Sequence, residues 1–470
     1  MTGDCKSVYP RSVQRLGQTT VAMVRTPQGK KLFLSSPLEG FDGERGGSGG
    51  MWAPLTPQNA RALARWFPWL VPNRQPSGVA GFGFGDRLGL ATPGHVAALE
   101  EARLFPVLAQ QSERENTRTG RGFAQVLADA IFGAFQEGYR AGFGADADHL
   151  KTLEAAGEAA LCGFRMFTCD PSEHIVPVED MAPGEVAERY KALSKPPRWE
   201  KDYLNRDFSI EGLGVMRFTE EQLVLACVKY AGALSFAAHM FGRLREQVPG
   251  GFDFELSVDE SAWPTTPHEH LFLALEWRRL EVGITSFAPR FPGVMEKGLD
   301  WQGDLAAFRS HLRAHCAIAT AFGPYRISLH SGSDKFSLYP LFAELDPGLW
   351  HVKTAGVSYL TGLGVLARRE PEFFREILGL AAERFYEDRQ AYQISSELPQ
   401  VEELKALSSN LEGVLFHPSW RQALHVTYGS VLQSPLGADL RRLLGCHEEE
   451  YRQALQSELG RHLQALGLRV

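Results

Sequence analysis

Two histidines and one aspartate offer side chains that could hold a metal ion. His330 directly follows the apolar run 327–329, His351 stands in the next such run, and Asp148 stands near the end of an earlier one. Imidazoles combined with a carboxylate suit a borderline divalent ion such as zinc, manganese, cobalt or nickel. A lone histidine can instead be a hydrogen-bonded part of the core, and for each of these two both interpretations stay open. We expect a divalent metal ion at Asp148, His330 and His351.

The loop that follows His330 has the composition of an anion-binding turn. In HSGSDK (330–335), small residues expose backbone N–H groups and Lys335 adds positive charge. Such a loop binds a phosphate or a sugar carboxylate equally well. Ser331, Ser333 and Lys335 are therefore expected to contact the substrate, and Asp334 to orient the lysine.

Short apolar runs alternate with amphipathic helices along most of the chain. This alternation is typical of parallel strands joined by helical crossovers. Eight runs are expected to be strands, at 78–86, 104–115, 142–150, 163–174, 252–260, 281–291, 325–333 and 349–356. Eight such units favour a closed (β/α)8 barrel of the TIM type, in the α/β class, over a doubly wound open sheet.

The rest of the chain is expected to decorate the barrel. Residues 23–36 resemble a hairpin, 56–67 a helix, and the helices after about residue 357 are expected to pack on the outside of the barrel. The expected segments are an N-terminal extension packed on the barrel (1–70), the catalytic barrel (71–430) with a mostly helical insertion (about 175–250), and a C-terminal helical extension (431–470).

Polar side chains gather where the predicted strands end, and this is where barrels carry their chemistry. Gln111, Arg290 and Lys353 stand at such ends, whereas the strand starts are apolar or glycine. Trp350 is either an apolar wall under the substrate or part of the core. The glycine run GFGFGD (81–86) lacks the G-x-G-x-x-G spacing, so we expect no nicotinamide and expect its glycines to pack toward the barrel interior.

Composition sets the class of protein. With 470 residues, 44% hydrophobic and 22% charged, the chain resembles a soluble globular protein. A formal charge of −7 and a pI near 6.1 give no basic surface for nucleic acid. Six cysteines without a C-x-x-C pair are expected to be reduced thiols. We find no signal peptide and no apolar span long enough to cross a bilayer, so we expect a cytoplasmic protein without a membrane partner, and leave self-association into a homo-oligomer open.

Longer motifs resemble the tagaturonate epimerase family over roughly residues 70 to 430. The segments that carry the resemblance are LAQQSERENTRTGR (108–121), GADADHLKT (144–152), VDESAWPTTPHEH (258–270), FAPRFPGVMEKGLDWQGDL (287–305), ISLHSGSDKFSLYP (327–340) and HVKTAGVSYL (351–360). The resemblance implies a barrel enzyme that interconverts D-tagaturonate and D-fructuronate with a divalent metal ion. It implies a sugar acid as the small-molecule partner.

The chemistry that the resemblance implies is unusual for an epimerase. The two sugar acids differ at a carbon β to the ketone, so removal of an α-proton cannot invert it. Retro-aldol cleavage, rotation and re-addition can, with a metal ion acting as Lewis acid and two carboxylates moving the hydroxyl proton. By resemblance, Glu115 and Glu260 are expected to be this catalytic pair. Candidates for binding the substrate carboxylate and hydroxyls are Arg118, Arg290, Lys335 and Lys353.

Two other functions fit the same residues. A class II-type sugar aldolase would share the cleavage step but release the fragments. A barrel without catalytic activity would only bind sugar acids.

Overall fold

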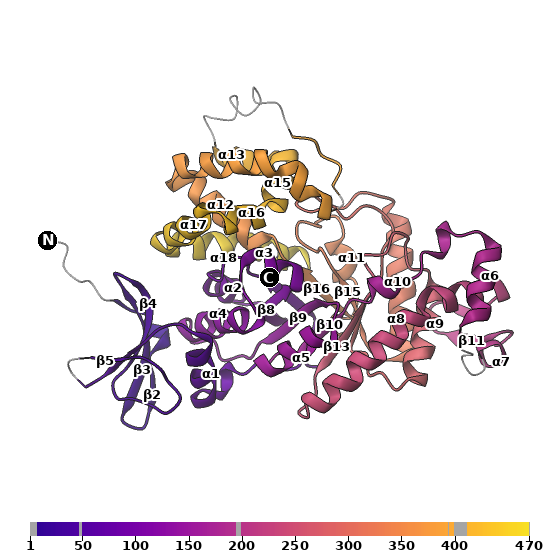
Figure 1. Cartoon of the computed structure of the whole chain (residues 1–470), viewed down its shortest axis with the longest axis horizontal. Coiled ribbons are helices and arrows are strands. Elements are labelled where there is room, and N and C mark those ends of the chain that lie inside the picture. Colours follow the sequence, from indigo (N-terminus) through magenta and orange to yellow (C-terminus); the bar gives the residue numbers. More distant parts are fainter. Residues whose placement is uncertain (1–6, 47–48, 194–198, 393, 399–410, 470) are drawn as a thin grey trace.

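The computed structural model describes residues 7–46, 49–193, 199–392, 394–398 and 411–469, and its centre is the predicted closed barrel (Figure 1). All eight strands are parallel, and the last is hydrogen-bonded to the first through the pair Val352 and Phe82. The strands are β7 Gly81–Gly85, β8 Phe105–Ser112, β9 Gly144–Leu150, β10 Met166–Cys169, β13 Asp253–Ser257, β14 Ser286–Ala288, β15 Arg326–Leu329 and β16 Trp350–Thr354. Each strand lies within one of the eight predicted runs.

The glycines of β7 leave room inside the barrel, as the sequence predicts. A Cβ atom on Gly83 would lie 1.5 Å from Oε1 of Gln110, and one on Gly81 would lie 2.0 Å from Nδ1 of His351. Any larger residue at either position would collide with a polar side chain of a neighbouring segment.

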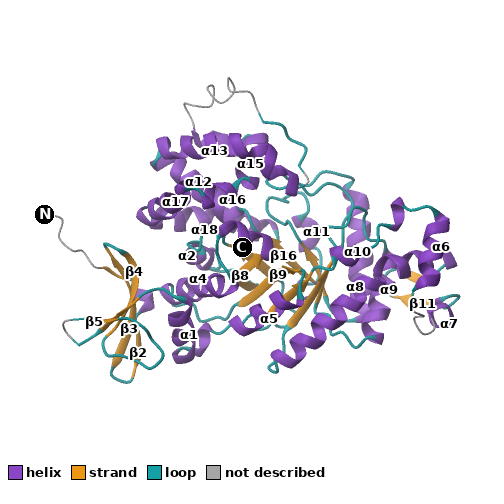
Figure 2. Cartoon of the chain, viewed as in Figure 1, coloured by secondary structure: helices purple, strands orange, loops and turns teal. Residues whose placement is uncertain are grey.

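Helices surround the barrel, as Figure 2 shows. A local sequence signal fixes the start of one of them: Thr266 and Glu269 form a capping box at the start of α9. The helices that follow the barrel strands are α2 Thr92–Ala98, α3 Glu113–Thr119, α4 Phe123–Gln136, α5 Leu153–Cys162, α8 Glu220–Gln247, α9 Pro267–Arg279, α10 Leu305–Phe322, α11 Tyr339–Ala343 and α12 Val357–Arg369. Short 3-10 turns are η1 Pro10–Ser12, η2 Pro68–Leu70, η3 Ser172–His174, η4 Val178–Asp180, η5 Pro347–Leu349, η6 Arg389–Ala391 and η7 Leu411–Phe416.

The segment between β10 and β13 is mostly helical but includes a small two-stranded ribbon. Its elements before α8 are α6 Pro183–Ala192, α7 Trp199–Tyr203, β11 Phe208–Ile210 and β12 Gly214–Met216. Contrary to the sequence expectation, α8 is long and apolar enough to cross a bilayer by length and composition. Just over half of its most apolar window is buried, and it packs against α5, α6 and α9, as a core helix does.

An antiparallel sheet precedes the barrel and lies to one side of it (Figure 1). It contains the predicted hairpin, formed by β3 and β4 with Thr26 opposite Gly29. The helix α1 Pro57–Trp66 follows, and Thr56 caps its start. The strands of the sheet are β1 Ser7–Val8, β2 Gln14–Leu16, β3 Thr19–Thr26, β4 Gly29–Leu34, β5 Glu44–Arg45 and β6 Met51–Ala53.

The C-terminal helices do more than cover the outside of the barrel, which corrects the sequence expectation. Tyr392 and His425 from this segment line the cavity at the ends of the strands, whereas α18 Glu448–Ala465 packs on α2 and α12 at the side of the barrel. Amphipathic patterns show that a helix packs, but they do not show against which surface. The helices before α18 are α13 Pro371–Asp388, α15 Pro418–Val426, α16 Tyr428–Gln433 and α17 Pro435–Cys446.

Candidate active site

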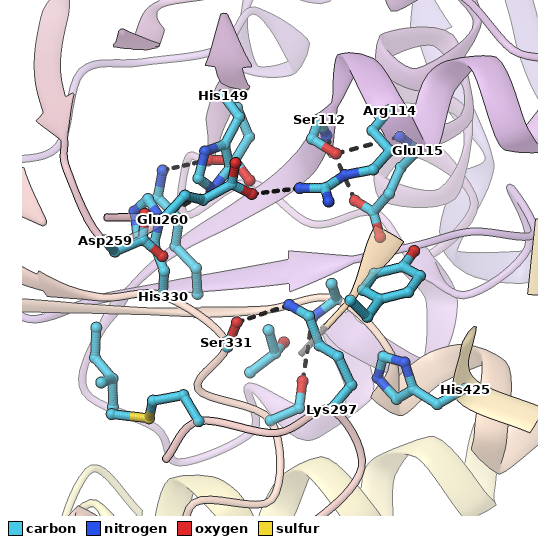
Figure 3. Close-up of a pocket in the computed structure, with 18 of the residues that line it drawn as sticks. Ser112, Arg114, Glu115, His149, Asp259, Glu260, Lys297, His330, Ser331 and His425 are labelled. Carbon is cyan, nitrogen blue, oxygen red and sulfur yellow. Dashed lines mark hydrogen bonds and ion pairs between the residues drawn. The ribbon is translucent and has the colours of Figure 1, made fainter. Parts of the chain in front are cut away.

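A cavity of about 390 Å³ opens at the C-terminal ends of the barrel strands (Figure 3). Side chains from strand ends form one wall, and the C-terminal segment forms part of another. The cavity has the size and position of a substrate site in a barrel enzyme.

Two imidazoles face each other on one side of this cavity. Nε2 of His149 lies 3.1 Å from Nδ1 of His330. At that distance one nitrogen donates and the other accepts, so in a pair of neutral rings one lone pair points into the space between them. A carboxylate oxygen of Asp148 completes a group whose ligand atoms all lie within 4.8 Å of one another.

A buried carboxylate fixes the outer nitrogen of each ring. Oδ2 of Asp170 lies 3.2 Å from Nδ1 of His149, and Oε1 of Glu255 lies 2.6 Å from Nε2 of His330. Histidines that bind metals are held in this way, because the outer hydrogen bond sets the tautomer and leaves the inner nitrogen free to coordinate.

The chain bends sharply at this site. His149 has φ of 50° and Ser331 has φ of 53°, a left-handed conformation that is costly for residues other than glycine. The bend at His149 breaks the alternation of β9, and this allows Asp148 and His149 to contribute to the same cluster.

The electrostatics of the cluster favour a cation. Burial acts to lower the pKa of His149, but Asp148, Asp170 and Asp259 outweigh it and raise the pKa to about 10. Burial also acts to lower the pKa of His330, but the carboxylate of Asp259 outweighs it and the pKa rises to about 9. Divalent metal ions are commonly bound by imidazoles together with carboxylates, which attract positive charge. The residues of this cluster therefore fit a divalent metal ion.

Lys353 forms the floor beneath this cluster. Its Nζ lies 2.7 Å from Oδ2 of Asp146, 2.8 Å from Oδ1 of Asp148 and 2.8 Å from Oε1 of Glu255. The side chain is buried and all three of its protons have partners, so Lys353 positions carboxylates instead of reaching for a substrate.

His351 is not brought to the cluster, although the sequence suggests it as a ligand. It lies near the start of β16, opposite Gly81, with Nδ1 3.2 Å from Oε1 of Gln75. Burial lowers its pKa to about 3. His149, which sequence alternation would place on the opposite face from Asp148, stands beside His330 instead.

Several expected substrate contacts have other partners. Lys335 donates to the backbone oxygens of Glu296, Leu299 and Ser333, and so joins two loops. Trp350 is buried against Phe342 in the core.

Other expected contacts divide between the cavity and its surroundings. Gln111 accepts from Arg121, and Arg118 donates to Tyr392; neither lines the main cavity. Arg290, Ser331 and Ser333 do line it.

Both expected catalytic carboxylates line the cavity within ion pairs. Oε1 of Glu115 lies 2.9 Å from Nε of Arg87, and Glu115 also closes the capping box of α3. Glu260 pairs with Arg114, which extends from the side of Glu115 (Figure 3). Their catalytic role stays a prediction.

Comparisons with known proteins agree with one another. The model of a family described as tagaturonate epimerase matches residues 9–466. The tagaturonate/fructuronate epimerase of Thermotoga maritima is 42% identical over 449 residues, which cover 95% of this chain and 91% of that protein. The native crystal structure of the fructuronate-tagaturonate epimerase from Cohnella laeviribosi is 36% identical with a TM-score of 0.92, covering 98% of this chain and 96% of that one. A glycerol complex of the same enzyme gives 35% identity and the same TM-score and coverage.

Proposed function

The chain belongs to the tagaturonate epimerase family and is an isomerase, and on this premise we propose that it interconverts D-tagaturonate and D-fructuronate with a divalent metal ion. The observation that carries the metal requirement is the pair of imidazoles that face each other at 3.1 Å, each held from behind by a buried carboxylate. Asp148, His149 and His330 would hold the ion.

Carbon–carbon cleavage explains how a carbon β to a ketone is inverted. The hydroxyl proton on that carbon passes to a base, the bond to the α-carbon breaks, and its electron pair moves toward the ketone oxygen. The products are an enediolate and a three-carbon aldehyde that carries the carboxylate. After the aldehyde turns over, the same bond forms on its other face and the proton returns. A divalent ion at the cluster would supply a Lewis acid for the ketone oxygen, worth several kcal/mol.

Glu115 and Glu260 remain the proposed carriers of the hydroxyl proton. Both carboxylates line the cavity, and both are oriented by arginines, Arg87 and Arg114. Positioned carboxylates of this kind contribute about 10²- to 10⁴-fold to a proton transfer.

The test is to incubate the purified protein with D-tagaturonate and cobalt, nickel, manganese or zinc, and to follow D-fructuronate by NMR. We expect conversion with at least one ion. In deuterated water the inverted carbon should keep its original hydrogen, because the proposed route breaks no carbon–hydrogen bond there. Deuterium at that carbon would refute the cleavage route, and no conversion with any ion would refute the function.

Two variants separate catalysis from metal binding. Glu260→Gln and His330→Ala should each abolish turnover, but only His330→Ala should also lose the metal. Near-normal rates in both would show that the site is assigned wrongly.

A further inference from the structure

A second polar group lies across the cavity from the imidazole cluster, and Lys297 is its centre (Figure 3). Lys297 stands in the loop that joins the C-terminal end of β14 to α10. Its Nζ donates to Oγ of Ser331 at 2.7 Å. Within the described parts of the chain, no carboxylate forms an ion pair with it.

Three other cations of the cavity wall already face carboxylates. Arg87 and Arg114 face Glu115 and Glu260, and Lys353 lies among three carboxylates. Positive charge is therefore neutralised at these positions, whereas at Lys297 it is left for a ligand.

Carboxylates near Lys297 do not fully compensate its charge. Burial and the guanidiniums of Arg114 and Arg87 lower the pKa of Lys297, and the carboxylates of Glu115 and Asp259 offset this only in part. An anion that binds there would gain a charge-assisted hydrogen bond in a partly desolvated site.

His425 adds an unused polar atom to the same side. Its ring lines the cavity, is 1% exposed, and packs closely on Gly356. Its Nδ1 has no hydrogen-bond partner among the described residues. A buried imidazole nitrogen without a partner is costly unless a ligand pairs with it.

We propose that Lys297, Ser331 and His425 bind the carboxylate of the substrate. This proposal rests on the proposed function and adds the direction in which the sugar acid lies. Its carboxylate end meets Lys297, and its ketone end meets the cluster of His149 and His330.

This orientation also explains why the enzyme would epimerise and not release fragments. Cleavage leaves the carboxylate on the three-carbon aldehyde, which is the fragment that must turn over. An anchor on the carboxylate retains that fragment while the aldehyde group rotates about the adjacent carbon–carbon bond. The other fragment is held at the opposite side of the cavity.

The first test measures binding without catalysis. D-gluconate is an open-chain sugar acid without a ketone, and D-sorbitol is its neutral counterpart. In calorimetric titrations, Lys297→Met should weaken gluconate binding by about 10- to 100-fold, as expected for loss of a hydrogen bond between charged groups. Sorbitol binding should change less than threefold. Lys297→Arg should recover part of the gluconate affinity, and Lys191→Met, an exposed lysine of α6, is the matched control.

The second test uses the reaction. With D-tagaturonate, Lys297→Met should raise KM by a similar factor and release an aldehyde that semicarbazide traps, whereas the wild type should release almost none. Equal weakening of gluconate and sorbitol, or unchanged gluconate affinity in a folded Lys297→Met variant, would overturn the anchor. If the wild type binds gluconate through Lys297 but does not turn over D-tagaturonate, the proposed function fails while the anchor stands.

Discussion

Asp170→Asn should weaken metal binding without removing any atom that contacts the metal. Asp170 uses its two oxygens differently: Oδ1 accepts from the backbone N–H of Ser172 at 3.0 Å, and Oδ2 faces Nδ1 of His149 at 3.2 Å. An asparagine can keep only one of these acceptors, so its NH₂ group would face His149 if Ser172 keeps its bond. Nδ1 would then have to accept, and the ring proton would move to Nε2, the atom that faces His330.

The size of the effect follows from this tautomer change. A carboxylate behind a metal-binding histidine is typically worth 10- to 100-fold in metal affinity, about 1.4 to 2.7 kcal/mol. We expect the loss of metal affinity in Asp170→Asn to lie in this range, because the substitution preserves the shape of the side chain and leaves the three carboxylates around Lys353 in place. Turnover should recover when the metal concentration is raised.

The assay is competition for cobalt or manganese against a chromophoric chelator, with the melting temperature measured alongside. Glu173→Gln removes an equal charge three residues away, from an exposed side chain, and should leave the affinity unchanged. A metal affinity for Asp170→Asn within twofold of the wild type, in a folded protein, would refute the assignment of His149.

Two further predictions concern stability and metal content. Burial acts to raise the pKa of Glu448, but its ion pair with Lys30 at 2.5 Å and other contacts lower the pKa to about 2. The ionised carboxylate therefore stabilises the fold above about pH 4.5, and this stabilisation is lost as the pH falls toward 2. Glu448→Gln should therefore lower the free energy of unfolding by about 2 kcal/mol at pH 7. This is less than the pKa shift alone implies, because burying the Lys30 ammonium is costly. A difference in the free energy of denaturant unfolding that does not shrink at pH 3 would contradict this prediction. His351→Leu should lower the melting temperature but keep the metal content of the wild type, since His351 contacts Gln75, and loss of metal would restore His351 as a ligand.

The barrel could be predicted from the sequence because its signals are local. Buried parallel strands are continuous apolar runs, and each of the eight runs contains one strand. The capping box at Thr266 is local in the same way, because a helix start depends on residues three positions apart.

The candidate metal cluster could be predicted only in part. Asp148 and His330 stand at strand ends, where barrel geometry places chemistry, and the structure brings them together. His149 is absent from the predicted ligands; strict alternation would point it away from Asp148, and only its left-handed backbone turns it inward. His351 is expected at the C-terminal end of its strand but lies near the start of it. The exact bounds of a strand are set less sharply by the sequence than its existence.

No local sequence pattern predicts the residues on the opposite side of the cavity. Lys297 lies in a long loop, and His425 comes from a helix more than 120 residues further along the chain. The sequence favours Lys335 as a substrate contact, yet three backbone carbonyls accept its protons. Which lysine has unused hydrogen-bonding capacity depends on contacts between distant segments, and these appear only in the folded chain.

We propose that Asp148, His149 and His330 hold one divalent ion on which epimerisation depends. The most direct measurement is the metal content of chelator-treated and reloaded protein, wild type beside His149→Ala, with D-tagaturonate turnover measured on the same samples. We predict one ion per chain and turnover in the reloaded wild type, and neither in His149→Ala. Full turnover in the metal-free wild type, or a full metal content and normal turnover in His149→Ala, would contradict the account.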